Sequence, residues 1–140
     1  MGTFNKHYDD VVEAIITGCD VYASNTNKKP YHTEFAVWDT GSTNTVISMK
    51  IVKALGLRPI GEAIVGSFGG GSTSSLYLVD IGLPTKDVVL ELEVIGSEDM
   101  EDYDILIGMD IINYGDMAIT NKGDKTTFAF RIPSTEEICF

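Results

Sequence analysis

Residues 35–42 read Phe-Ala-Val-Trp-Asp-Thr-Gly-Ser, which places one carboxylic acid, Asp39, at the end of an apolar run that has the pattern of a strand. Burying a lone carboxylate is costly unless it is paired or neutralised, so Asp39 is badly placed for a purely structural residue. Gly41 gives the turn that follows unusual backbone freedom. An ordinary turn is the alternative interpretation, because Asp, Thr, Gly and Ser are all common in turns.

A second motif lies at residues 104–114, which read Asp-Ile-Leu-Ile-Gly-Met-Asp-Ile-Ile-Asn-Tyr. The wholly apolar run 105–107 predicts a short strand with both faces covered, and Gly108 ends it. Asp110 is then expected to be the N-cap of a short helix. Between the two motifs, a Gly-rich stretch at 65–72 lies between two strand-like runs and predicts a long hairpin.

In this order, the Asp-Thr-Gly-Ser turn, the Gly-rich hairpin and the Ile-Leu-Ile-Gly-Met-Asp motif resemble the retropepsin-like (retroviral-type) aspartic proteases of the single-lobe cellular or bacterial type. The resemblance covers roughly residues 30–132, with 133–140 as a tail, and residues 1–140 are expected to form one domain. It implies an all-β fold, namely a closed, barrel-like lobe with one or two short helices.

The resemblance also implies roles for individual residues. Asp39 would be the catalytic acid and base, and Thr40 would form a hydrogen bond across a dimer axis. Gly41 would let the backbone pass close to the paired acids, and Ser42 would place a hydroxyl beside the carboxylate. Two further supporting residues, Ile107 and Gly108, would pack beneath the active turn.

The Gly-rich hairpin corresponds to the flap that folds over substrate in this family. Its predicted substrate-facing residues are Phe68, Gly69, Gly70 and Gly71, although Phe68 could equally pack on the underside of the hairpin. Phosphate binding is a weaker interpretation. The glycines match neither G-x-G-x-x-G nor a P-loop, and a strand rather than a helix follows them.

Aspartic protease chemistry requires two carboxylates, one to activate water and one, protonated, to polarise the peptide carbonyl. This chain has one Asp-Thr-Gly, and Asp80-Ile81-Gly82 lacks the hydroxyl. The resemblance therefore implies a homodimeric aspartic endopeptidase, a hydrolase of peptide or protein substrates with one Asp39 from each subunit. A non-catalytic module for dimerisation or peptide binding on the same fold is the alternative.

Composition narrows the function further. The net charge of −11 makes nucleic acid and anionic membranes poor partners, and no 18-residue apolar stretch is present. Cys19 and Cys139 fit no metal or redox spacing and are expected as free thiols in the cytoplasm, with a disulfide as the less favoured alternative.

No metal or cofactor is predicted. The acids at 98–104 lack the spacing of a calcium loop and are expected to form a solvated loop. His7 and His32 have no Cys or acid partner at a ligand spacing, which argues against zinc.

The remaining pattern predicts mostly short strands with one further helix. A helix through Ile51 is expected to end at Gly56. The strands are expected at residues 11–17, 21–24, 31–38, 60–66, 76–81, 88–95, 117–120 and 126–132.

Overall fold

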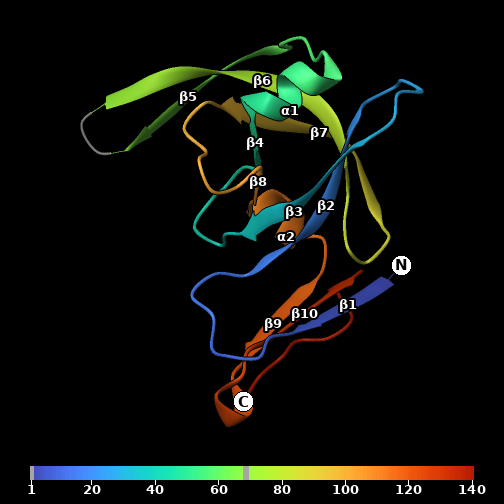
Figure 1. The fold of residues 1–140 in the computed structure, drawn as a ribbon, viewed down its shortest axis with the longest axis vertical. Coiled ribbons are helices and arrows are strands. Elements are labelled where there is room, and N and C mark those ends of the chain that lie inside the picture. The colour runs from blue at the N-terminus through green and yellow to red at the C-terminus, as the bar shows by residue number, and fades with distance from the viewer. Residues whose placement is uncertain (1, 68–69) are drawn as a thin grey trace.

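The computed structural model describes residues 2–67 and 70–140 (Figure 1). Within these ranges, side chains are described for all residues except 65–67 and 70. Ten strands and three short helical segments follow one another along the chain. They are β1 (Gly2–His7), β2 (Ile16–Ala23), β3 (Tyr31–Trp38), β4 (Val46–Ser48), α1 (Met49–Leu55), β5 (Gly61–Ser67), β6 (Gly70–Gly82), β7 (Val88–Ser97), β8 (Ile105–Ile107), α2 (Met109–Ile112), β9 (Asp116–Thr120), η1 (Lys122–Asp124) and β10 (Thr127–Ile132).

The larger sheet closes into a barrel. Its strand order is β2-β3-β8-β4-β7-β6, and a further pairing between β2 and β6 closes the ring, while β5 extends from the free edge of β6. Fully buried aliphatic side chains fill the interior, and they include Val21, Ile47, Val79, Ile105 and Ile107. The expectation of an all-β, barrel-like lobe with short helices is confirmed.

A three-stranded antiparallel sheet with the order β1-β10-β9 lies against one end of this barrel (Figure 1). Trp38, the last residue of β3, joins the two layers, because its ring centroid lies 5.0 Å from that of Phe128 and 4.8 Å from that of Phe130. The indole Nε1 also donates to Thr17 Oγ1 at 2.9 Å. The aromatic cluster therefore fixes the end of the strand that leads directly to Asp39.

The predicted bounds of β3 and the predicted end of α1 are confirmed, whereas Ile47, which had helical spacing with Ile51, lies in β4 before the helix. Strand β3 spans Tyr31–Trp38. Helix α1 ends at Gly56, whose φ of 63° lies in the left-handed region that glycine adopts readily. At the other end of α1, the Ser48 hydroxyl accepts from Lys50 N and satisfies one free backbone donor.

The N-terminal third departs from the prediction. No strand was expected at residues 2–7, yet β1 pairs with β10 and buries Phe4 against Phe128. The run predicted as a strand from Val11 becomes strand only at Ile16, and the break predicted at Gly18 is a register shift inside β2.

Hydrogen bonds from side chains hold residues 8–15 as an ordered loop in place of the predicted strand. The Tyr8 hydroxyl donates to Ile16 O at 3.0 Å, and Val12 N donates to Thr126 Oγ1 at 3.0 Å. These contacts satisfy backbone groups that a strand would have paired with a neighbour.

Two predictions about charged residues need correction. Asp104 is not solvated with its neighbours, because it is buried and accepts from Thr33 Oγ1 at 2.5 Å and from Lys50 Nζ at 2.7 Å. His32 does have acidic partners: its ring nitrogens lie 2.9 Å from a Glu34 oxygen and 2.7 Å from an Asp20 oxygen. Hydrogen bonds to Glu34 and then to Asp20 raise the pKa of His32.

Both cysteines are free thiols, with Cys19 buried and Cys139 exposed. Burial raises the pKa of Cys19 to about 12, so its thiol stays protonated and unreactive near neutral pH. Among the described residues, no helix has the length and apolar character needed to cross a membrane.

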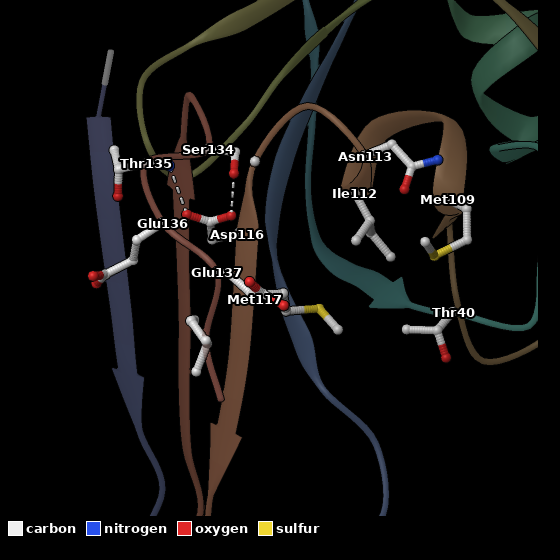
Figure 2. Close-up of a pocket in the computed structure, with 12 residues that line it drawn as sticks. Thr40, Met109, Ile112, Asn113, Asp116, Met117, Ser134, Thr135, Glu136 and Glu137 are labelled. Carbon is white, nitrogen blue, oxygen red and sulfur yellow. Dashed lines mark hydrogen bonds between the residues drawn. The ribbon is translucent and has the colours of Figure 1, made fainter. Parts of the chain in front are cut away.

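The C-terminal tail, residues 133–140, has no regular secondary structure, but Asp116 at the start of β9 holds its first part (Figure 2). The Asp116 carboxylate accepts from Ser134 Oγ at 2.5 Å, Thr135 N at 2.9 Å and Arg131 Nε at 2.8 Å. Hydrogen bonds from Ser134, then Thr135, then Arg131 lower the pKa of Asp116 far below its usual range.

Replacing Asp116 with Asn is expected to release the tail, because the amide cannot accept from all three donors. Since the folded-state pKa of Asp116 is lowered, its stabilising effect is present above the ordinary carboxyl pKa and is lost as pH falls through the folded-state value. Backbone ¹⁵N relaxation at neutral pH should show faster motion of residues 134–138 in Asp116→Asn. It should not change in Glu137→Gln, which alters an exposed acid of the same tail; equal relaxation in both variants would contradict this role.

Candidate active site

Asp39 lies at the point where β3 leaves the barrel. Strands β3 and β8 run parallel, with Trp38 opposite Ile107, and Asp39 N donates to Ile107 O at 2.9 Å. The Asp39 carboxylate is half-buried, and its Oδ1 accepts from Gly41 N at 2.8 Å. Among the described residues, no hydrogen bond reaches Oδ2. One oxygen is thus held by the turn while the other is available.

The chain after Asp39 is held by the segment that follows β8. Met109 N donates to Ser42 O at 2.8 Å, and Asp110 N donates to Thr43 O at 3.3 Å. Asp110 also bonds the buried Thr45 through both carboxylate oxygens, accepting from Thr45 N at 2.8 Å and from its hydroxyl at 2.7 Å. Residues 39–45, called the active turn below, are therefore fixed from one side by residues 107–110.

Two predicted side-chain roles are different in the structure. Asp110 is not the N-cap of α2, since Gly108 precedes the helix and the Asp110 carboxylate instead bonds the active turn. The Ser42 hydroxyl does not donate to Asp39, because it donates to Asn44 O at 2.7 Å. Ser42 therefore braces the turn internally, and Thr45 and Asp110 are supporting residues that the sequence did not reveal.

Gly108 lies where no side chain fits. A Cβ at this position would lie 2.7 Å from both the carbonyl carbon and oxygen of Asn44 and 2.9 Å from Ser42 O. Gly108 N also donates to Thr45 Oγ1 at 3.1 Å. Ile107, next to it, is fully buried. Both residues predicted to support the active turn thus lie directly against it.

Part of the predicted flap can be placed. Gly70 and Gly71 open β6 and pair with Ser67 and Gly66 of β5. Phe68 and Gly69, the other two predicted substrate-facing residues, lie outside the described residues.

Two cavities flank Thr40, which is exposed at the tip of the active turn. The first, of about 480 Å³, also reaches Asp39 and is called the Asp39 cavity below; its walls are largely apolar. The second, of about 810 Å³, lies between α2 and the C-terminal tail, with Thr40 and α2 on one side and Ser134 to Glu137 on the other (Figure 2). The turn that carries Asp39 therefore borders open space on both sides.

The described residues hold no group of three His, Cys, Asp or Glu side chains arranged for a metal ion.

Replacing Gly108 with Ala should destabilise the protein by about 1–3 kcal/mol, because the new methyl group would meet rigid backbone. Gly61→Ala is the matched control: it also adds one methyl group to glycine, but its Cβ would lie 3.9 Å from a Leu76 methyl. Urea unfolding measures both changes. A free energy of unfolding reduced no more in Gly108→Ala than in Gly61→Ala would show that this contact does not constrain the turn.

Neither a family model nor a curated protein matches the chain. Solved structures do match it. The EIAV protease complexed with the inhibitor HBY-793 is 17% identical with a TM-score of 0.53, over 71% of this chain and 86% of that one. A retropepsin-like aspartic protease from Rickettsia conorii is 8% identical with a TM-score of 0.53, over 91% of each chain. Simian foamy virus protease is 19% identical with a TM-score of 0.49, over 71% and 93%. The chain therefore has the fold of the retropepsin-like aspartic proteases.

Proposed function

We propose that this protein is a homodimeric aspartic endopeptidase whose active site forms from the Asp39 carboxylates of two chains. The observation that supports this most directly is the presentation of Asp39. A half-buried carboxylate stands on a turn held from one side by β8 and α2, with Oδ1 fixed by Gly41 N and Oδ2 available. Two solved structures with this fold, each with a TM-score of 0.53, are themselves named as proteases.

The chemistry follows from bringing two such carboxylates together. Two like charges about 3 Å apart cannot both ionise readily, so the pair retains one proton. The ionised carboxylate removes a proton from a water molecule as the water oxygen attacks the peptide carbonyl carbon, and the protonated carboxyl donates its proton to the carbonyl oxygen. The tetrahedral intermediate then collapses: the C–N bond breaks, the leaving nitrogen takes up the proton that came from water, and the new carboxyl product returns the other proton to the acid pair. In each chain, Gly41 N fixes the orientation of one oxygen, so the reacting oxygens need little reorganisation.

The proposal takes the second acid from another chain, because Asp80, the other acid in an Asp-x-Gly sequence, is engaged elsewhere. Asp80 lies on β6 opposite Tyr22, and its Oδ1 accepts from Ser24 Oγ at 2.7 Å and from Glu91 N at 2.8 Å. Asp80 lines neither cavity beside Thr40. A two-fold axis beside Asp39 and Thr40 would pair the two catalytic acids and let the two Thr40 side chains meet.

The hairpin of β5 and β6 is the proposed lid over this site. It projects from the barrel beyond the neighbouring strands (Figure 1). On β5, Ile64 is 84% exposed. An exposed apolar side chain on a projecting hairpin is suited to close over a peptide and exclude water from the reaction.

Replacing Asp39 with Asn should abolish peptide cleavage and leave the fold intact, because the amide has nearly the same shape but cannot take a proton. Loss of such a group costs several orders of magnitude in kcat. The matched variant Asp80→Asn keeps an acceptor oxygen and should retain activity. Cleavage of a peptide library, with circular dichroism as the folding control, measures both; appreciable cleavage by Asp39→Asn would place the acid elsewhere.

Activity should belong to the dimer alone. Each chain carries a net charge of −11, so repulsion between two chains opposes association and added salt should favour it. Specific activity is expected to fall on dilution and to recover partly in moderate salt.

Mixing wild type with excess Asp39→Asn should also reduce activity, since a mixed dimer has one acid. Specific activity that stays constant down to a monomer, as measured by light scattering, would argue against a shared site.

A further inference from the structure

Three segments of the proposed site contain no lysine or arginine. This holds for the active turn, for the β5–β6 hairpin and for residues 98–110, which form the loop, strand and helix beside the turn. Between Pro59 and Asn121 the sequence has one basic side chain, Lys86, and many acids. These segments therefore carry negative charge that no basic side chain within them offsets.

The Asp39 cavity, where we expect a substrate to bind, has the same excess of acidic over basic side chains. Its lining includes two acids, Asp39 and Glu13, and no basic side chain. The remaining walls are mainly apolar and include Val37, Tyr103 and Leu106. Such a cavity suits an apolar side chain at the cleaved bond, with negative charge at its rim.

Further carboxylates continue that rim. Tyr103 ends a loop in which Glu98, Asp99, Glu101 and Asp102 are all exposed. Among the described residues, neither these four acids nor Glu13 forms a salt bridge, and Lys50, the nearby cation, is paired with the buried Asp104. Their charges are therefore not neutralised by the protein.

Two basic residues next to the cavity lining have acids beside them. Lys122 and Lys125 lie in the turn that contributes Asn121 and Thr126 to the lining, and both are exposed. One acid, Asp124, lies in the same turn. A second, Asp10, is adjacent to it, because the Asp10 backbone oxygen accepts from Thr126 N. This end of the cavity therefore adds no excess of positive charge.

We propose that the site prefers peptides that carry lysine or arginine on both sides of an apolar pair at the cleaved bond. This inference rests on the proposed function, because the two-fold axis places one acidic rim on each side of the paired Asp39 residues. An extended peptide that crosses the axis meets the Glu13 and 98–102 carboxylates of one subunit and then those of the other. Complementary charge of this kind favours specificity and fast association.

The preference can be tested with three octapeptides that share Leu-Phe at the centre and differ only in four flanking positions, which are Lys, Gln or Glu. An exposed ion pair is worth up to about fivefold in affinity, so the Lys peptide should exceed the Glu peptide in kcat/KM by at least about fivefold at low salt. The gap should narrow in 0.5 M salt, where charges are screened. Glu13→Gln should reduce the gap, whereas Glu93→Gln, on an exposed part of β7 outside the cavity, should not.

Binding of uncleavable analogues to Asp39→Asn, followed by fluorescence anisotropy, separates this inference from the proposed function. If the Lys analogue binds more tightly than the others but wild type cleaves no peptide, the preference for basic flanking residues is supported and the peptidase function is rejected. Cleavage of all three peptides at equal rates would keep the peptidase and overturn the inference. Equal or absent binding of the three analogues would also overturn it.

Discussion

The hydrogen bonds between the active turn and residues 107–110 are the constraint on which the rest of the site depends. Ile107 O, Met109 N and the Asp110 carboxylate hold the turn at successive points from Asp39 to Thr45. Gly108 allows the two segments to approach because it has no side chain. Parallel pairing of β3 with β8 brings these segments together, and the packing of Trp38 on Phe128 and Phe130 fixes the end of β3.

Most strands and the position of Asp39 at the end of β3 were predictable because they depend on local patterns, whereas closure of the barrel was implied by the family resemblance. Alternating or wholly apolar runs indicated most strands, and Gly56 and Gly108 ended elements as expected. The roles of Asp110 and Ser42 were not predictable, because each side chain bonds a partner that the fold determines. Asp110 has the sequence position of a helix cap, yet both of its carboxylate oxygens accept hydrogen bonds from Thr45, which is far away in the chain. β1 was missed because only its alternate residues are partly buried, and Phe4 is the one large apolar residue among them.

The distribution of charged side chains is the basis of the proposed substrate preference. Self-association of the proposed kind would be easier for a chain with a neutral surface, yet this chain is strongly acidic and has no basic residue in the active turn, in the β5–β6 hairpin or at 98–110. Asp104 forms a salt bridge with Lys50, and Asp116 forms one with Arg131, so the charges of these two carboxylates are offset within the protein. The carboxylates left exposed at 98–102 form no salt bridge among the described residues, and the proposed preference for basic peptides depends on them.

The stoichiometry of an uncleavable peptide isostere with a central hydroxyl tests the shared site most directly, by calorimetry and by a crystal structure of the complex. The account predicts one inhibitor for every two chains, with the hydroxyl between the two Asp39 carboxylates. One inhibitor bound per chain, or a bound hydroxyl that contacts a single Asp39, would contradict it.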